Sequence, residues 1–377
     1  MLKFLIAYLS GREQRVVIEN KLSLWLPVHS GVPQGSILGP ILFVIFINDL
    51  PEGLTPGTDL ALYADDTKIW RSIKAESDHL ALQNDIAYLN SWSNNNKLHF
   101  NIGKCKVLSV ANRPNPLLGI LPHIQFWYFL GENLLEYTDH EKDLGVNVNT
   151  KLNWSDHCNK IYSKANQMLG LTRRTCHFIC DEKRKRALYL TLVRSQFEHC
   201  SVIWHPTGKT LLQKLETIQK RAIKWILSEE YSSYSSHSTY IHKCRQTNLL
   251  PISEKFVLND LILFHKAVYN YISLELPYYL NFFNGSTRLR SSHLDELSIV
   301  SCVEPRTNPY NFDSNNNRNT FANSFFYRTH ILWNQLPFDV RKIACTKTFK
   351  KDLVDYLWKS LLHDNNSSDE DDLIDFG

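Results

Sequence analysis

Hydrophobic and polar residues follow different patterns before and after residue 155. Upstream, short apolar runs are separated by Gly-rich and Pro-rich turns, which predicts strands and a few helices. Downstream, apolar residues recur at three- and four-residue spacing, which is typical of amphipathic helices. The sequence therefore predicts an α+β region followed by a mostly helical one.

The first region is predicted to begin with the end of a helix, a turn at Gly11 and a strand at residues 16–18. A loop at residues 30–40, with three glycines and two prolines, leads into a helix at residues 37–50. Ser36 can cap that helix at its N-terminus. Because the helix is apolar nearly all round, we expect it to be buried and central.

A second helix is predicted at residues 78–93 from the apolar stripe Leu80, Leu82, Ile86, Leu89 and Trp92. Three strand pairs are predicted: residues 59–70 with Asp65 and Asp66 at the tip, residues 98–112 with a turn at Gly103, and residues 141–154 with a turn near Asn149. We expect an antiparallel sheet backed by the two helices.

Helical patterns follow from Ser155. The clearest covers residues 210–227, where lysines and arginines flank the apolar stripe Leu211, Leu212, Leu215, Ile218, Ala222, Ile226 and Leu227. A Ser/Tyr-rich link at residues 228–240 precedes a C-terminal helical region, and the acidic tail from about Asp364 is predicted to be disordered. The predicted domains are residues 1–155, 156–230, 231–363 and 364–377.

Composition is that of an ordinary globular protein, with 43% hydrophobic residues, so most of the chain is expected to bury a core. Six of the 38 acids lie in the tail, which leaves 42 basic against 32 acidic residues in the body. A basic body fits a polyanionic partner, although a charge of this size also occurs on ordinary soluble proteins. The longest apolar run, residues 37–47, is too short to cross a bilayer, so no membrane partner is expected.

The eight cysteines show no recurring short spacing, which predicts reduced thiols and an intracellular protein, in the nucleus or the cytoplasm. A zinc site is an alternative, but one Cys-x3-Cys spacing without a second pair matches it weakly. Buried thiols on helices are the simpler interpretation. The residues concerned are Cys176, His177, Cys180, His199, Cys200 and His205.

The adjacent acids Asp65 and Asp66 are the first candidates for chemistry. Mg²⁺ usually takes one or two carboxylates together with substrate phosphates. A two-metal site needs carboxylates from more than one strand, and neighbours on one strand point to opposite faces. Taken alone, the pair therefore supplies half of a site, and a polar hairpin turn is the more common role of such a pair.

The wider context changes that weighting. The segment "GVPQGSILGP" at residues 31–40 followed by "YADD" at residues 63–66 resembles motifs B and C of the reverse transcriptase family. The resemblance is strongest to non-LTR (LINE-type, jockey/CR1-like) retrotransposons. Residues 98–108 resemble motif D, residues 142–154 resemble motif E, the primer grip, and the later helices look like a thumb. The resemblance covers roughly residues 1–360 and implies part of a right-hand polymerase.

This resemblance assigns roles to individual residues. Asp65 and Asp66 would hold catalytic Mg²⁺, and Lys104 would act as general acid. The template and the incoming dNTP would be positioned by Gly31, Pro33, Gln34, Gly35, Tyr63 and Ala64. The primer grip would contain Leu144 and Gly145. Phosphates of an RNA template and DNA primer would be contacted by Lys160, Lys164, Arg173, Arg174 and residues 183–186. A solvated lysine beside a turn, and solvated helix faces, remain the alternatives for Lys104 and for the other basic residues.

The sequence also departs from the family pattern. Motif A, a strand with a further metal-binding Asp, precedes motif B in the family, whereas the acids here, Glu13 and Glu19, lack its context. Gly39 stands where Ser is frequent. We therefore expect a reverse transcriptase fragment, truncated before motif B, with little polymerase activity alone. Because fingers and one strand are missing, we also expect an exposed sheet edge and an apolar patch. The alternatives are a non-catalytic RNA- or DNA-binding remnant and a relic of a mobile element without a role.

Overall fold

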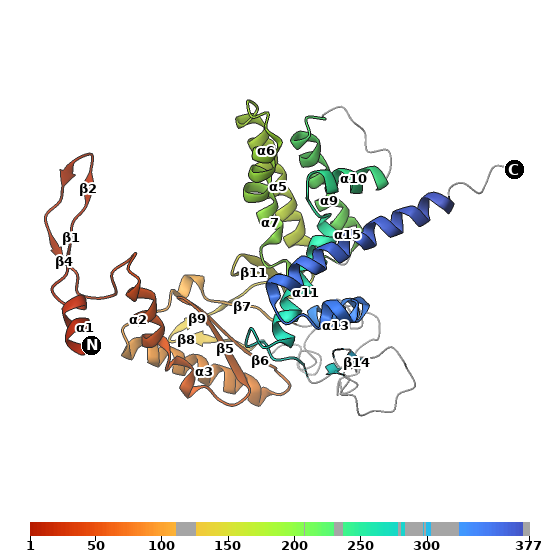
Figure 1. Ribbon diagram of the computed structural model, residues 1–377. Helices are drawn as coiled ribbons and strands as arrows, with labels where there is room; N and C mark the ends of the chain where they lie inside the picture. Colours follow the sequence, from red (N-terminus) through yellow and green to blue (C-terminus); the bar gives the residue numbers. More distant parts are fainter. Residues whose placement is uncertain are drawn as a thin grey trace. The chain divides into compact units, whose positions relative to one another are not determined.

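The computed structural model of the 377-residue chain describes residues 1–110, 126–206, 208–229, 237–277, 280–282, 297, 299–302 and 324–371. The chain divides into two compact units, residues 1–109 with 113–138 and residues 139–377 with 110–112. Figure 1 draws the first unit in red to orange and the second in yellow to blue. The hairpin that resembles the primer grip thus belongs to the second unit.

The first unit begins with helix α1 (Leu2–Leu9), after which Gly11 turns the chain with φ +64°. Four short strands follow: β1 (Glu13–Gln14), β2 (Val17–Ile18), β3 (Lys21–Leu22) and β4 (Leu26–Pro27). Strand β1 pairs with β4 and β2 pairs with β3, both antiparallel. The turn and the strand predicted for this region are confirmed.

The centre of the first unit contains helix α2 (Leu38–Ile47), the short 3-10 helix η1 (Leu50–Gly53), strands β5 (Thr58–Tyr63) and β6 (Asp66–Arg71), and helix α3 (Glu76–Asn95). Strands β5 and β6 form the predicted antiparallel hairpin, in unbroken register. Its residues alternate between half-buried and exposed, as expected for a hairpin with one face in water. The half-buried Leu60, Leu62 and Ile69 pack with Leu89 and Trp92 of α3.

Helix α3 also packs on a second small cluster. Its Ile86 contacts the segment around strands β8 (Phe129–Leu130) and β9 (Asn133–Leu134). His79 shares a hydrogen bond of 2.5 Å with Tyr128 and stacks on a further ring of that segment. Leu80 is exposed instead, so its predicted place in the stripe is wrong: a histidine with a partner takes the buried side of that turn.

Helix α2 corrects the expectation of a buried, central helix. Only Gly39 and Ile47 are buried, whereas Ile41, Val44 and Ile45 are exposed, Ile45 at 67%. The helix is apolar all round, but the hairpin and α3 contact one of its sides, so the remaining apolar side chains face outward. The expected exposed apolar patch is therefore present on α2.

The strand pair predicted at residues 98–112 is wrong. Residues Ile102–Lys104 form the 3-10 turn η2, closed by Lys104 N–H donating to the carbonyl of Asn101 at 2.9 Å. Gly103 therefore lies in a helical turn instead of a hairpin. The strand β7 (Lys106–Val107) that follows pairs in parallel with β10 (Glu136–Tyr137). Within the described residues every sheet has two strands, so the expected continuous antiparallel sheet is not found there.

The second unit starts with strands β11 (His140–Asp143) and β12 (Val146–Asn149) and continues as helices. These are α5 (Ser155–Thr175), α6 (Glu182–Leu188), the π-helical η3 (Tyr189–Arg194), α7 (Ser195–Glu198), α8 (Ser201–Trp204), α9 (Lys209–Ile226), α10 (His237–Gln246), α11 (Ile252–Val268), α13 (Phe325–Gln335), α14 (Phe338–Arg341) and α15 (Thr346–Asp371). Strands β13 (Leu280–Phe282) and β14 (Ile299–Cys302) form one further antiparallel pair. The helical character predicted after residue 155 is confirmed.

Two apolar cores hold this unit together. In the first, Leu215, Ile218, Ala222 and Ile226 of α9 are almost fully buried, which confirms the central part of the predicted stripe. The second is built around Trp333 and around residues of α11 and α15. A buried amide connects the helices within the unit: Gln219 accepts hydrogen bonds from η3 and donates to the carbonyl of Leu250 at 2.9 Å. Burial of this polar group is compatible with stability because the amide is hydrogen-bonded at both ends.

Three remaining expectations concern the linker, the tail and the membrane. Residues 230–236 of the Ser/Tyr-rich link lie outside the described residues. Helix α15 continues to Asp371, so the part of the acidic tail up to that residue is helical instead of disordered. No described helix is both long and apolar enough to cross a membrane.

Candidate functional site

The hairpin of β5 and β6 sets the positions of the two adjacent acids. Tyr63 pairs with Asp66, so Ala64 and Asp65 form a two-residue turn, in which Ala64 has φ +51°. Asp65 therefore lies in the turn and only Asp66 belongs to a strand. Neighbouring residues on one strand point to opposite faces, but this does not apply to Asp65 because it lies in the turn. The expectation that Asp65 and Asp66 must point in opposite directions is therefore corrected.

The carboxylates of Asp65 and Asp66 are exposed, as is Tyr63. Carboxylate oxygens are suitable ligands for Mg²⁺, which is often completed by water and substrate phosphates. In the part of the chain that the structure describes, no group of three or more His, Cys, Asp or Glu side chains is placed to hold a metal. The metal ligands available at this hairpin tip are therefore the two carboxylates. This donor set suits a Mg²⁺ ion whose remaining coordination positions are filled by phosphate oxygens.

The loop before α2 depends on two glycines. Gly31 and Gly35 have φ +75° and +77°, a left-handed conformation that other residues adopt with strain. The Ser36 hydroxyl donates to the carbonyl of Pro33 at 2.7 Å and accepts from the Gly39 N–H in the first turn of α2 at 3.0 Å, although Ile37 is the residue at the N-cap position. A Cβ on Gly39 would lie 2.9 Å from that hydroxyl oxygen. A side chain at position 39 would therefore crowd the Ser36 hydroxyl and the Pro33 carbonyl.

Arg12 holds the same loop and was not identified from the sequence. Its guanidinium donates to the carbonyl of Leu9 at the end of α1 and to the carbonyl of Gly31 at 2.5 Å. It thereby ties α1 to the loop that carries Gly31 and Gly35. A lone arginine after a glycine turn gives no sequence signal for such a long-range contact.

Lys104, the candidate general acid, is exposed at the end of η2. Within the described residues, no hydrogen bond or ion pair joins its ammonium group to Asp65 or Asp66. The structure therefore leaves its catalytic role as a prediction.

The hairpin of β11 and β12 turns at Leu144 and Gly145, with φ +44° and +92°. Positive φ at both central residues defines the two-residue turn that suits the twist of a hairpin. The turn predicted near Asn149 is wrong, because Asn149 ends β12 and its side chain bonds to Asn153 at 3.0 and 3.1 Å. The Asn-rich segment forms a side-chain-stabilised bend after the strand, while the Leu-Gly pair makes the reversal.

Two histidines from the helices hold this hairpin. His199 Nε2–H donates to the carbonyl of Leu144 at 3.0 Å, and a Cβ on Gly145 would lie 3.0 Å from the same nitrogen. His157 Nδ1 accepts from the Asn147 N–H at 3.1 Å. Burial, together with the positive charge of Lys160 and the neighbouring His199, lowers the pKa of His157 to about 4. His157 is therefore neutral at pH 7, as its acceptor role requires.

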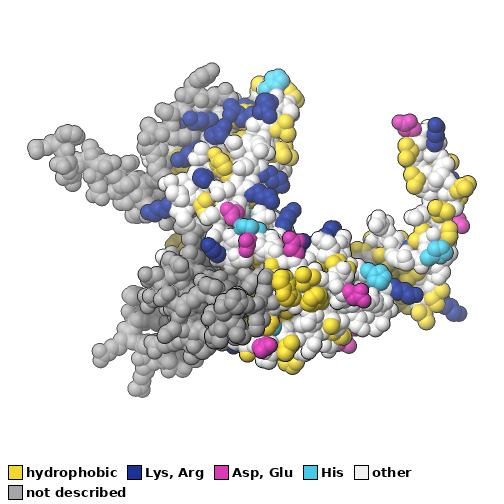
Figure 2. Space-filling model, turned by 180° about the vertical axis from the view of Figure 1, so that it is seen from behind, with side chains coloured by type: hydrophobic (Ala, Val, Ile, Leu, Met, Phe, Trp, Pro, Cys, Tyr) yellow, Lys and Arg dark blue, Asp and Glu magenta, His cyan; other side chains and the backbone are white. Residues whose placement is uncertain are grey.

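The four basic residues assigned to phosphate contacts lie at two places on α5. Lys160 donates to the Asn147 side chain at 3.3 Å, beside the hairpin, and Lys164 is exposed further along the helix. Arg173 and Arg174 lie at the other end of α5 and line a hollow of about 730 Å³. Figure 2 shows the dark-blue Lys and Arg side chains along this helical part of the surface.

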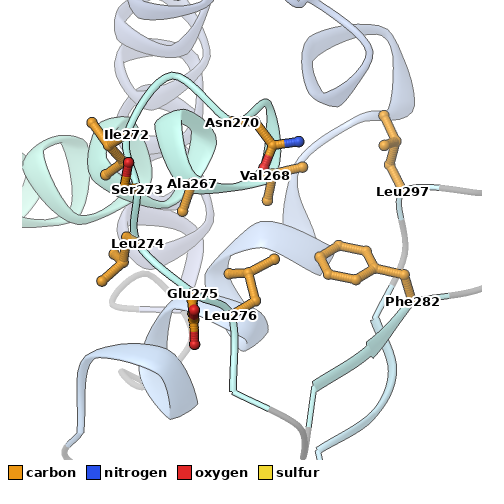
Figure 3. A pocket seen from close by; sticks show the side chains of 10 residues that line it. All are labelled: Ala267, Val268, Asn270, Ile272, Ser273, Leu274, Glu275, Leu276, Phe282 and Leu297. Carbon is orange, nitrogen blue, oxygen red and sulfur yellow. The ribbon is translucent and has the colours of Figure 1, made fainter.

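A second hollow, of about 580 Å³, lies in the C-terminal part of the second unit (Figure 3). Its lining is mostly apolar and includes Ile272, Leu274, Leu276 and Phe282, with Glu275 as its charged residue. This lining brings no set of titratable groups together, so the hollow is not a candidate for catalysis.

The zinc alternative is not supported by the described residues. The cysteines and histidines between residues 176 and 205 form no metal-binding group there. The Cys158 and Cys244 thiols are buried, and burial raises the pKa of each to about 12. The three cysteines for which buried thiols on helices were predicted differ from that prediction: Cys176 and Cys200 are partly exposed and lie at helix ends, and Cys180 is exposed.

Comparison with known proteins relates the first part of the chain to a known family. Residues 3–171, slightly less than half of the chain, match the family described as reverse transcriptase (RNA-dependent DNA polymerase). The resemblance predicted from the order of motifs B and C is confirmed.

The relatives are polymerases of mobile elements. Over 165 residues, 41% of this chain and 17% of the relative, the chain is 31% identical to an RNA-directed DNA polymerase from mobile element jockey of Drosophila melanogaster. Over 267 residues, 66% of this chain and 27% of the relative, it is 27% identical to a probable RNA-directed DNA polymerase from transposon BS of the same species. A third relative, from transposon X-element of that species, is 24% identical over 60% of this chain and 25% of its own length.

The chain thus spans about a quarter or less of the length of these relatives. The alignment of 267 residues is longer than the family segment at residues 3–171. The similarity therefore extends beyond that segment. No solved structure matches the chain.

Proposed function

We propose that this chain is part of the RNA-directed DNA polymerase of a non-LTR retrotransposon and carries its motifs B to E. The observation that carries the proposal is the in-register hairpin that presents Asp65 and Asp66 at an exposed turn, within the segment that matches the family. The motif B loop, with its two left-handed glycines, supports the same assignment.

In this proposal Asp65, assisted by Asp66, holds Mg²⁺. The metal supplies charge stabilisation for the attacking and leaving oxygens of nucleotidyl transfer. Gly31 and Gly35 expose backbone to which a nucleotide can come close. Tyr63 and Ala64 set the hairpin tip against the incoming dNTP, and Lys104 donates a proton to the leaving pyrophosphate.

The second unit supplies nucleic-acid contacts. Leu144 and Gly145 form the primer grip, and the histidines beneath them fix its turn. The basic side chains of α5 contact phosphates of the template and primer. In this assignment residues 1–155 are part of a polymerase palm, residues 156–230 a thumb and residues 231–363 a C-terminal helical region.

We further propose that the chain alone has negligible polymerase activity, because two-metal chemistry needs an acid of motif A in addition to this hairpin. The test is extension of a DNA primer on an RNA template with Mg²⁺ and all four dNTPs, with Asp65→Ala as the matched variant. We expect neither protein to extend the primer. Robust extension that Asp65→Ala abolishes would show that the chain completes the site by itself.

The alternative is a non-catalytic module that binds RNA or DNA, which the cluster of basic side chains at the end of α5 favours. Binding to a primer–template that weakens with added salt, at a slope indicating several released counterions, supports this module. Absence of binding at low salt would contradict this module and would favour the remaining alternative, a relic of a mobile element without a role.

A further inference from the structure

The hollow at the end of α5 has an unusual charge. It lies between α5, α6 and α9 of the second unit, and the side chains lining it include Arg173, Arg174, Lys185 and Arg221, but no acid. Of these four cations, Arg221 was not among the residues assigned to phosphate contacts from the sequence. Helices remote in sequence therefore direct positive charge to one place.

Lys185 contributes a buried cation to the lining of this hollow. The residue is only 6% exposed, and its ammonium donates to the carbonyl of Trp225 at 3.0 Å and to the hydroxyl of Ser228 at 2.8 Å. Both acceptors are neutral, and the ion pairs of the described residues do not include Lys185. Buried charges are ordinarily paired, because removing them from water is costly. Two of the three N–H groups donate to protein acceptors, and the centroid of the Trp225 ring lies 5.8 Å from the ammonium, so the protein satisfies this charge in part without an acid.

The arginines at the rim are similar. Arg221 donates to the neutral side chain of Asn166 at 2.7 Å, and neither Arg221 nor Arg174 forms an ion pair with a described acid. Planar guanidinium groups recognise phosphate oxygens through paired hydrogen bonds. The chemistry of the hollow is therefore that of a phosphate site.

An aromatic ring lies next to this charge. Phe178 is 70% exposed, and its ring centroid lies 5.8 Å from that of His177, which lines the hollow. A large exposed ring beside basic side chains is typical of surfaces on which unpaired bases stack.

We propose that this hollow binds a phosphate group of a nucleic-acid strand and that Phe178 stacks on an unpaired base beside it. The proposal rests on the proposed function insofar as that function makes RNA or DNA the substrate. It deepens that function by adding Arg221 and Phe178 and by favouring a single-stranded segment at this place.

The test is equilibrium binding of a fluorescent single-stranded RNA to the full chain, followed by anisotropy without Mg²⁺ or dNTP. The double variant Arg174→Gln/Arg221→Gln changes two exposed residues of the hollow. Lys209→Gln/Lys214→Gln removes the same charge from the opposite end of α9 and serves as the control. We expect about tenfold weaker binding for the first variant, with a salt slope smaller by about 1.4, and about twofold or less for the control.

Phe178→Ala tests the stacking separately. We expect it to weaken binding of the single strand about tenfold and to leave a blunt duplex unaffected. Circular dichroism melting of each variant establishes that the helices remain folded. Equal losses in the hollow variant and its control would overturn the proposal, because generic charge would then explain binding.

Inorganic pyrophosphate distinguishes a strand from a free anion. If pyrophosphate competes only weakly with RNA, and Arg174→Gln/Arg221→Gln loses affinity for RNA, the ligand of the hollow is the nucleic-acid strand. If pyrophosphate binds the wild-type chain and not the hollow variant, while both bind RNA equally, the hollow is a free-anion site and the assignment to nucleic acid is wrong. Because no polymerisation takes place in this assay, failure of the catalytic proposal would leave its result unchanged.

Discussion

The two units differ in how they support the residues proposed to be functional. In the first unit, the hairpin with Asp65 rests on two small clusters, and α2 exposes apolar side chains. In the second unit, the turn at Gly145 is held by two histidines, and α9 buries its apolar face almost completely. The second unit therefore supports its turn on well-buried helices, although it also exposes single side chains such as Phe178, whereas the first leaves several neighbouring apolar side chains of one helix exposed. Large exposed apolar patches commonly mark surfaces that contact another partner.

The largest effect we expect comes from a matched pair of isoleucines. Ile218→Ala removes a fully buried side chain of α9, and the resulting cavity should cost about 2 to 5 kcal/mol of unfolding free energy. Ile45→Ala, on the exposed face of α2, should change stability by less than about 0.5 kcal/mol. Urea denaturation followed by circular dichroism measures both values.

The same pair tests whether α2 is uncovered in solution. We expect Ile45→Ala to increase solubility, because it reduces an exposed apolar patch. A loss of stability as large as that of Ile218→Ala would mean that another surface covers α2, and the contrast between the units would fail.

The next effect concerns the acid sensitivity of the second unit. The unfolded chain takes up a proton on His157 near pH 6.5, but burial holds the folded-state pKa at about 4. Unfolding therefore binds a proton between these values, so stability falls as pH decreases from about 6.5 to 4. At pH 5 this group should cost about 2 kcal/mol relative to pH 7.

Denaturation at pH 7 and pH 5 measures this cost. His157→Gln should remove that part of the difference between the two pH values, and His242→Gln, which changes an exposed histidine of α10, should keep it. If the two variants show the same pH dependence, His157 does not stabilise the hairpin as a buried neutral acceptor.

Elements with a self-contained pattern were predictable from the sequence. The period of α9 placed Leu215, Ile218, Ala222 and Ile226 on one face, and the structure buries them. The strand alternation on either side of Asp65 predicted the hairpin, because a two-residue repeat with one apolar face leaves little freedom of register. Local periodicity carries this information by itself.

Features that depend on distant partners were not predictable. The apolar character of α2 predicts burial, but nothing in its own sequence says what covers Ile45. Asn149 is a common turn residue, yet the reversal lies at Leu144 and Gly145, where a histidine more than fifty residues later meets the turn. Within the candidate site, the acids were found from motif order, whereas Arg12 and His199 act through contacts that only the fold creates.

The last comparison concerns two aspartates of the first unit. Asp85 is 1% exposed and accepts hydrogen bonds from the N–H and the hydroxyl of Thr55, both at 2.8 Å. Asp85→Ala would leave these donors without partners and should cost about 1 to 3 kcal/mol. Asp65 is exposed, and Asp65→Ala should change stability by less than about 0.5 kcal/mol. Thermal melting of the two variants measures the contrast. A neutral effect at Asp65 means that the carboxylate is not needed for folding, which is the pattern expected of a metal ligand. A destabilisation equal to that of Asp85→Ala would instead return Asp65 to the role of a structural turn residue.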